Sequence, residues 1–157
     1  MKDQNTIGIK EETAASLAEK LNVLLSDYQV YYQNLRGFHW NIQGRQFFTL
    51  HAKFEELYND TLTIIDDVAE RILTLDEIPF HTLEDYFAHT SIKSYKNVND
   101  GVEAAKAIVE NLQTIVEVQR DVLEAASEAG DEGTVDMISD LIARQEKNIW
   151  MFHAYLK

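Results

Sequence analysis

The amino-acid sequence predicts an all-α protein that folds as one four-helix bundle over residues 1–157. Residues that interrupt helices are scarce, since the chain has a single proline, Pro79, and six glycines. Apolar side chains recur every three to four positions through long stretches, as they do on the buried stripe of an amphipathic helix. A chain of 157 residues suits one domain with one sizeable hydrophobic core.

Four long helical patterns follow one another along the chain. We expect helices at about residues 11–42, 46–75, 101–129 and 132–156. The apolar residues that define the first of them are Leu17, Leu21, Leu24, Leu25, Tyr28 and Tyr32. Gly44 and Gly130 supply stops after the first and third helices, and Asp131 is a candidate N-cap of the fourth.

A long connection over residues 76–100 joins the second helix to the third, and we expect a short helix within it at residues 83–89. Long loops inside compact domains usually have a task. The simplest task here is to carry the chain from one end of a bundle to the other. Four helices with one long crossover after the second have the topology of a ferritin-like bundle.

Composition narrows the kind of site that the protein can hold. The chain has no cysteine, so disulfides and thiolate metal sites are excluded. A metal site would use His, Asp and Glu, a hard ligand set that suits iron, manganese or zinc. The chain has a formal net charge of −13, whereas a duplex-DNA binder usually has a basic face or tail. The N-terminal stretch MKDQNTIGIKEE is not a basic arm, because it contains two lysines and three acidic residues.

We expect neither a signal peptide nor a membrane span. Residues 1–30 lack an apolar signal core and a cleavage site, and the sequence has no apolar run of about 18 residues. A cytoplasmic location is therefore the default expectation.

The second helix divides into three faces when successive residues are placed about 100° apart. A core stripe contains Leu50, Phe54, Leu57, Ile64, Ile65, Val68, Ile72 and Leu75. A predicted solvent face contains Lys53, Glu56, Asp60, Thr63, Asp67, Arg71 and Thr74. The third face mixes potential metal ligands with apolar residues: His51, Glu55, Tyr58, Asn59, Leu62, Asp66, Ala69, Glu70 and Leu73.

The potential ligands of the third face cannot form one site within one chain. Glu55 and Asp66 lie about 16 Å apart along the helix axis, whereas metal ligands converge within a few ångströms. Two copies of the helix, paired antiparallel about a two-fold axis near residues 60–61, would bring His51 to the partner's Glu70 and Glu55 to the partner's Asp66. The index sums 51 + 70 and 55 + 66 are both 121. Such an isologous dimer would carry two identical sites, with Tyr58, Leu62, Ala69 and Leu73 packed between them.

A simpler interpretation stays open at this point. Carboxylates four residues apart on a helix are commonly solvated surface charges, although Asp66 and Glu70 would then repel each other mildly. His39, taken alone, can be a hydrogen-bonded histidine near a helix end. His81, His89 and His153 have no spaced partners, and we interpret them as structural or surface residues.

The run FHWNIQGRQFFTLHAKFEELYND, followed by DDVAERI, resembles the Dps family, the ferritin-like mini-ferritins of bacteria and archaea. The likeness covers nearly the whole chain, down to EKNIWMFHAYL. It implies a homo-oligomeric shell of twelve subunits built from two-fold dimers, with ferroxidase sites between the two-fold-related subunits. The resemblance assigns His39, His51 and Glu55 of one subunit, with Asp66 and Glu70 of its mate, as catalytic metal ligands. The family often has Asp where Glu55 stands, so the reach of that ligand differs here.

The resemblance also implies an activity. Fe(II) would be oxidised to Fe(III), preferably with hydrogen peroxide and with oxygen as the other oxidant, at sites that hold two irons each. Ferric oxyhydroxide would be stored in the shell, which protects against oxidative damage by removing iron and peroxide together. Trp40 would lie close to the site, where the family's tryptophan can intercept oxidising equivalents; a packed aromatic is the alternative.

Iron must also enter the shell. The family's negative pores lie near the start of the fourth helix, where this chain has Asp131, Glu132, Asp136 and, less favoured, Asp140. Acidic residues also favour helix N-termini for reasons unrelated to a pore.

Other classes of function remain as alternatives. No Glu-x-x-His motif occurs, which disfavours a di-iron site inside a single bundle. A DNA-compacting starvation protein with secondary iron storage is the runner-up, although members that bind DNA usually carry basic tails. A structural helical assembly without chemistry is the third hypothesis.

Overall fold

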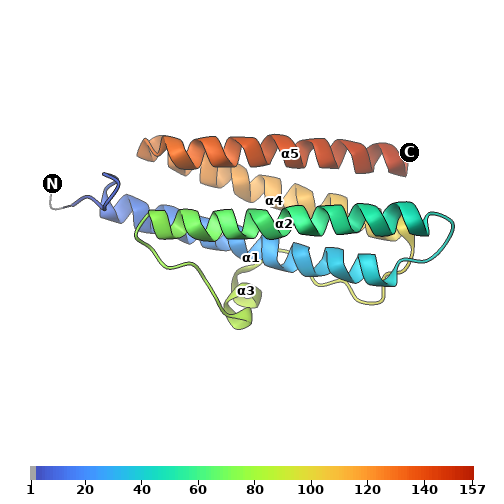
Figure 1. Ribbon diagram of the computed structural model, residues 1–157. Coiled ribbons are helices and arrows are strands. Elements are labelled where there is room, and N and C mark those ends of the chain that lie inside the picture. The colour runs from blue at the N-terminus through green and yellow to red at the C-terminus, as the bar shows by residue number, and fades with distance from the viewer. Residues whose placement is uncertain (1–2) are drawn as a thin grey trace.

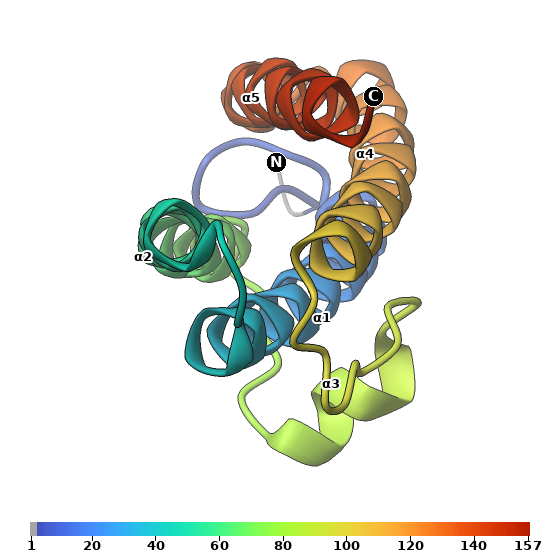
Figure 2. The same cartoon turned by 90° about the vertical axis from the view of Figure 1, so that its right-hand side faces the viewer.

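The computed structural model describes residues 3–157, and it is helical almost throughout. Four long helices, α1 (Glu11–Asn41), α2 (Phe47–Thr74), α4 (Gly101–Ala129) and α5 (Glu132–Leu156), form the bundle, and α3 (Leu83–His89) lies in the crossover. Viewed end-on, the four long helices surround a common core while α3 lies outside it against α1 (Figure 2). The predicted fold class, including the short helix in the crossover, is confirmed.

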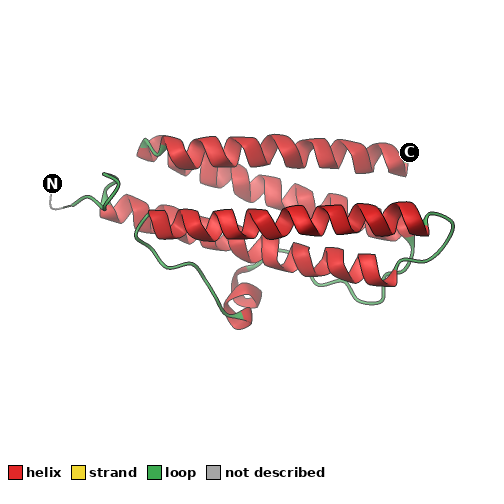
Figure 3. Ribbon diagram, in the orientation of Figure 1, coloured by secondary structure: helices red, strands yellow, loops and turns green. Residues whose placement is uncertain are grey.

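Gly44, Gly130 and Asp131 lie at helix ends, as the sequence predicts. Gly44 and Gly130 have positive φ angles of 106° and 69°, which suit glycine after a helix. The side chain of Asp131 accepts a hydrogen bond from the Thr134 amide and so caps α5, as predicted. The crossover begins beyond α2 and runs along the outside of the bundle to the start of α4 (Figures 1 and 3).

The core stripe of α2 is buried at every predicted position, from Leu50 to Leu75. Two residues of the predicted solvent face of α2 contact α5. Asp60 pairs with Arg144 of α5, although 41% of its side chain stays exposed. Arg71, whose side chain is 18% exposed, binds Asp131 and Thr134 at the start of α5, so the predicted solvent position is wrong for Arg71. Each helix of a four-helix bundle has two neighbours, so a polar side chain at the edge of the stripe can bridge from α2 to α5.

Three buried polar side chains of α1 hold the crossover against the bundle. The Asn22 side chain accepts a hydrogen bond from the Phe80 amide, and the Asn34 side chain accepts one from the Tyr95 amide. Between them, Asp27 accepts hydrogen bonds from the Thr90 hydroxyl and the Ser91 amide, both at 2.8 Å. These contacts satisfy backbone donors that the irregular crossover would otherwise leave unpaired near the core.

The N-terminal segment is folded back onto the end of α2. Asn5 donates a hydrogen bond to the Leu75 carbonyl. Thr6 donates to both carboxylate oxygens of Asp76, through its amide to one at 2.8 Å and through its hydroxyl to the other at 2.9 Å. These hydrogen bonds hold the pKa of Asp76 below its ordinary value. The C-terminal end of α2 is therefore bonded to the N-terminal segment through Asn5 and Thr6, and to the start of α5 through Arg71.

Candidate metal centre

The site begins with two histidines on either side of the turn between α1 and α2. His39 lies in the last turn of α1, and His51 lies near the start of α2. The turn at Gly44 brings their imidazoles into a stack, with ring centroids 3.7 Å apart and planes inclined by 12°. His39 is only 8% exposed, and His51 is half-buried.

Each of the two histidines binds the backbone of the other. Nδ1 of His39 lies 2.6 Å from the carbonyl oxygen of His51, and Nδ1 of His51 lies 2.8 Å from the carbonyl oxygen of His39. A carbonyl can only accept, so both Nδ1 atoms carry the proton. In the neutral imidazole the lone pair is then on Nε2, the nitrogen that a metal ion would bind. The fold thus fixes the tautomer that a pair of metal ligands requires.

Two aromatic rings enclose this stack. Phe47 stacks on His51 at a centroid distance of 4.8 Å, and Tyr58 presents an edge to His39 at 5.3 Å. Desolvation, and after it the negative charge of Glu55, raises the pKa of Tyr58. Glu55 itself is exposed one turn beyond His51 on the same face of α2. The histidine pair therefore lies at the start of α2, and Glu55 follows His51 by one helical turn.

Asp66 and Glu70 lie elsewhere on the same face. Both are exposed, about three and about four turns further along α2 than Glu55. Over residues 3–157, no three His, Asp or Glu side chains of one chain come together closely enough to hold a metal ion. The structure thus brings together His39 and His51, with Glu55 one helical turn beyond His51, and keeps Asp66 and Glu70 apart from them.

The face of α2 that carries all these residues is open in the single chain. Leu62 and Leu73 are 51% and 56% exposed although both are large and apolar. Tyr58 and Ala69 are half-buried beside them. An apolar strip of this kind, lined by polar groups, is typical of a surface that is covered by another molecule.

The predicted pore residues differ in their surroundings. Asp131 is only 3% exposed, because its carboxylate caps α5 and pairs with the Arg71 guanidinium at 2.5 Å. Glu132 and Asp136 are exposed near the start of α5. Asp140, which is exposed too, lies 3.7 Å from Arg144.

The remaining predicted residues lie outside the histidine stack. Trp40 is 58% exposed at the end of α1, directly after His39. His81 and His89 make local hydrogen bonds to carbonyls of the crossover, and His153 is exposed on α5. Sequence reasoning did not find the contacts of Phe47 and of Arg36, although four-residue spacings on one helix, 47 to 51 and 36 to 40, were a signal for both.

The chain is similar to known proteins over most of its length. The family model of the ferritin-like domain matches residues 18–157. A DNA protection during starvation protein of Porphyromonas gingivalis is 43% identical over 148 residues, which cover 94% of this chain and 93% of the relative. In Bacillus subtilis, general stress protein 20U is 36% identical over 140 residues, 89% of this chain and 97% of that protein.

Solved structures give the same result. The crystal structure of a Dps protein from Vibrio cholerae, described as a member of the ferritin-like diiron-carboxylate proteins, superimposes with a TM-score of 0.97 at 47% identity. The match covers 99% of this chain and 98% of that one. A Dps protein from Bacillus brevis superimposes with a TM-score of 0.90 at 36% identity, covering 93% and 98% of the two chains.

The fold and the matching domain model define a ferritin-like protein. Within that class, the chain belongs to the Dps family. In residues 3–157 we find no helix long and apolar enough to cross a membrane.

Proposed function

We propose that this protein is a ferroxidase that oxidises Fe(II), preferably with hydrogen peroxide, at sites shared by two copies of the chain, and that it stores the Fe(III) product in a shell of twelve subunits. The observation that carries the proposal is the reciprocal histidine pair, because it leaves the lone pair of each Nε2 atom available to a metal ion. The diiron-carboxylate description of the similar Vibrio cholerae protein supports iron as the metal.

The second half of the site comes from the partner copy in this proposal. Antiparallel pairing of two α2 helices would place the partner's Glu70 near His51 and the partner's Asp66 near Glu55. The exposed apolar residues Leu62 and Leu73 lie on the same face, so their burial would stabilise the pairing. Two identical sites result from the two-fold symmetry.

The donor set suits iron oxidation. Two imidazole nitrogens and three carboxylates are acceptable to Fe(II), and the harder Fe(III) prefers the anionic oxygen donors. Hydrogen peroxide takes up two electrons and two protons to give two waters, so two Fe(II) ions per site supply both electrons. Iron is the substrate here, because the ferric product leaves for the interior of the shell.

Glu132 and Asp136 are our candidates for the iron-entry pore. Both are exposed near the N-terminus of α5, whereas the Asp131 carboxylate is held by Arg71 and by the helix cap. We therefore assign Asp131 the task of shaping the pore region rather than binding iron within it.

The experiment is peroxide-driven Fe(II) oxidation by a variant with both His39→Ala and His51→Ala, on protein whose assembly size is measured. Oxidation should fall to the rate without protein, and anaerobic titration should lose the two tightly bound Fe(II) ions per site. The matched control is His81→Ala with His89→Ala, which removes two histidines outside the stack. Unchanged oxidation in the first variant would reject the assignment.

The DNA-compacting alternative is less well supported. The net charge is −13, and residues 3–10 are folded onto the end of α2 through Thr6 and Asp76 instead of forming a free basic tail. A gel-shift measurement with duplex DNA at low salt tests this alternative: a shifted band would support DNA binding, and an unshifted one would reject it.

A further inference from the structure

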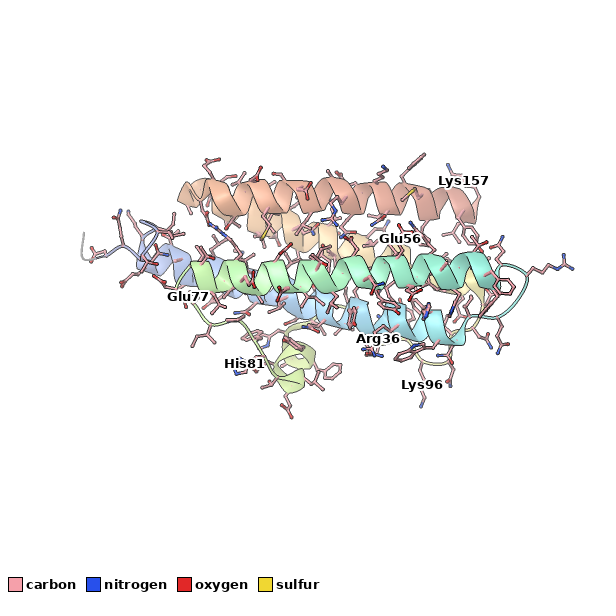
Figure 4. All side chains as sticks on the ribbon, in the orientation of Figure 1. Arg36, Glu56, Glu77, His81, Lys96 and Lys157 are labelled. Atoms are coloured by element: carbon pink, nitrogen blue, oxygen red, sulfur yellow. The ribbon has the colours of Figure 1, made fainter. Side chains whose placement is uncertain are left out.

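Arg36 lies against two aromatic rings of α1. Its guanidinium carbon is 4.8 Å from the ring centroid of Trp40 and 5.2 Å from that of Tyr32. The three residues are spaced by four, so they form one stripe along the helix. Figure 4 labels Arg36 on the side of the bundle where α3 lies. At these distances a cation is attracted by the negative face of an aromatic ring.

The charge of Arg36 is not neutralised by a carboxylate. Its hydrogen bond goes to the side-chain oxygen of Gln33 at 3.4 Å, and no acidic group pairs with it in residues 3–157. By contrast, Arg71, Arg120 and Arg144 each pair with a carboxylate. No carboxylate in residues 3–157 therefore offsets the positive charge that Arg36 holds over the two rings.

Both rings are connected to the histidine pair. Trp40 directly follows His39 in α1. Tyr32 packs edge-on against Tyr58 at 6.0 Å, and Tyr58 packs edge-on against His39 at 5.3 Å. An oxidant that forms at the histidines can therefore draw an electron from Tyr32 through Tyr58, or from Trp40 through the backbone of α1.

We propose that Arg36 protects Trp40 and Tyr32 from one-electron oxidation by holding a positive charge over their rings. The physical reason is that oxidation of an indole or phenol first gives a radical cation. The attraction between Arg36 and the neutral ring then becomes repulsion between like charges. Arg36 therefore makes removal of an electron from either ring less favourable.

The need for such protection rests on the function proposed above. Peroxide requires two electrons and two protons to give two waters. When a site holds a single Fe(II), that ion supplies one electron, and the indole of Trp40 can supply the second while it loses one proton. The other proton comes from the solvent. The products are Fe(III), a neutral indolyl radical and two waters. Raising the cost of this step leaves the second electron to be supplied by a further Fe(II) ion.

The test compares two tryptophans within one molecule. Trp150 is 66% exposed, similar to Trp40, and over residues 3–157 no arginine or lysine lies above its ring. Arg36→Met keeps aliphatic bulk over Trp40 without the charge, and Arg36→Lys keeps a charge. After peroxide is added to protein with one Fe(II) per site, peptide mass mapping measures oxidation of each tryptophan. We expect Arg36→Met to raise Trp40 oxidation about threefold relative to Trp150, and Arg36→Lys to raise it less.

Arg120→Met is the matched control. Arg120 lies in the same surface groove as Trp150, pairs with Glu146 and does not lie over the indole ring. Its replacement should change oxidation of neither tryptophan. The proposal is overturned when Arg36→Met leaves the ratio of Trp40 to Trp150 oxidation unchanged, or when the methionine and lysine variants raise it equally, because loss of shape then explains the effect.

A second measurement separates this inference from the proposed function. Azide radicals, which are uncharged one-electron oxidants, are generated by radiolysis in the absence of iron. Protection by Arg36 predicts the same order of variants, while a failure of ferroxidase activity alone would leave this order intact. An equal Trp40 to Trp150 ratio in all variants would overturn the proposal whatever the protein does with iron.

Discussion

His39 and His51 each donate a hydrogen bond from Nδ1 to the backbone carbonyl of the other, at 2.6 and 2.8 Å, while their rings are stacked. The exchange joins the end of α1 to the start of α2 across a short turn. It holds two imidazoles parallel with the same tautomer before any metal arrives. The conformational entropy of the two imidazoles is thus lost during folding, so ordering them does not weaken metal binding.

The reciprocal bonds predict non-additive effects on stability. His39→Ala or His51→Ala should each lower the free energy of unfolding of the metal-free protein by about 1 kcal/mol. Either substitution disturbs the stack on which the other ring depends, so the double variant should lose less than the sum. Urea denaturation of the four proteins measures the coupling, and additive losses would show that the two histidines act independently.

Asp27 predicts a pH dependence of stability. Burial raises the pKa of this carboxyl above its ordinary value, against the opposing effect of the Ser91 and Thr90 hydrogen bonds. Its second oxygen, Oδ2, is buried without a partner. Because the folded-state pKa is raised, the stabilising contribution is complete below the ordinary carboxyl pKa and is lost as pH rises through the raised value.

Asp27→Asn removes this titration. The difference in unfolding free energy, variant minus wild type, should therefore increase as pH rises from the ordinary carboxyl range through the raised pKa. Denaturant midpoints at a series of pH values give this difference directly. A flat difference for Asp27→Asn over this pH range would contradict the prediction.

Arg71 should contribute strongly to stability because its partner is buried. Arg71→Met leaves the carboxylate of Asp131, which is 3% exposed, without its cation, and the expected loss is about 3 kcal/mol. Adding Asp131→Asn removes the uncompensated charge while it retains an oxygen that can cap α5, so the double variant should recover part of the loss. Thermal denaturation compares the variants, and the exposed pair Arg120–Glu146 provides a control expected to lose less than about 1 kcal/mol.

Two helical glycines should respond in opposite directions to alanine. A Cβ at Gly101 would stand 2.6 Å from Leu50 Cδ1 and 3.1 Å from the Tyr155 hydroxyl, so Gly101→Ala should cost about 1–3 kcal/mol. At Gly37, within α1, a Cβ would meet nothing within 4 Å. Gly37→Ala should stabilise by up to about 1 kcal/mol through helix propensity. Thermal denaturation should give a melting temperature below that of wild type for Gly101→Ala and above it for Gly37→Ala.

Much of the fold could be predicted from the sequence because its signals are local. Apolar spacing located the four long helices, and Gly44 and Gly130 marked the ends of α1 and α4. The angular sorting of α2 also gave the buried stripe correctly. It missed the contacts of Asp60 and Arg71 with α5, since a single-helix projection contains no information about which neighbouring helix lies beside an edge position.

The site was accessible to sequence reasoning only in part. The proximity of His39 and His51 follows from the turn between α1 and α2, and the position of Glu55 one turn beyond His51 follows from the helical period. The reciprocal hydrogen bonds do not, because they depend on rotamers and on the backbone geometry around Gly44. The position of Arg36 over Trp40 likewise depends on side-chain conformations that spacing allows without requiring.

Complementation between two inactive variants tests the shared site. One chain carries His39→Ala with His51→Ala, and the other carries Asp66→Asn with Glu70→Gln. In a mixed dimer, the intact histidines of the second chain meet the intact acids of the first, so one of the two sites is complete. Each variant alone should be inactive, whereas unfolding and random reassembly of equal amounts should restore about a quarter of the wild-type sites, because half of the dimers are mixed. Peroxide-driven Fe(II) oxidation measures the recovery, and a mixture as inactive as its components would place all the ligands of a site within one chain.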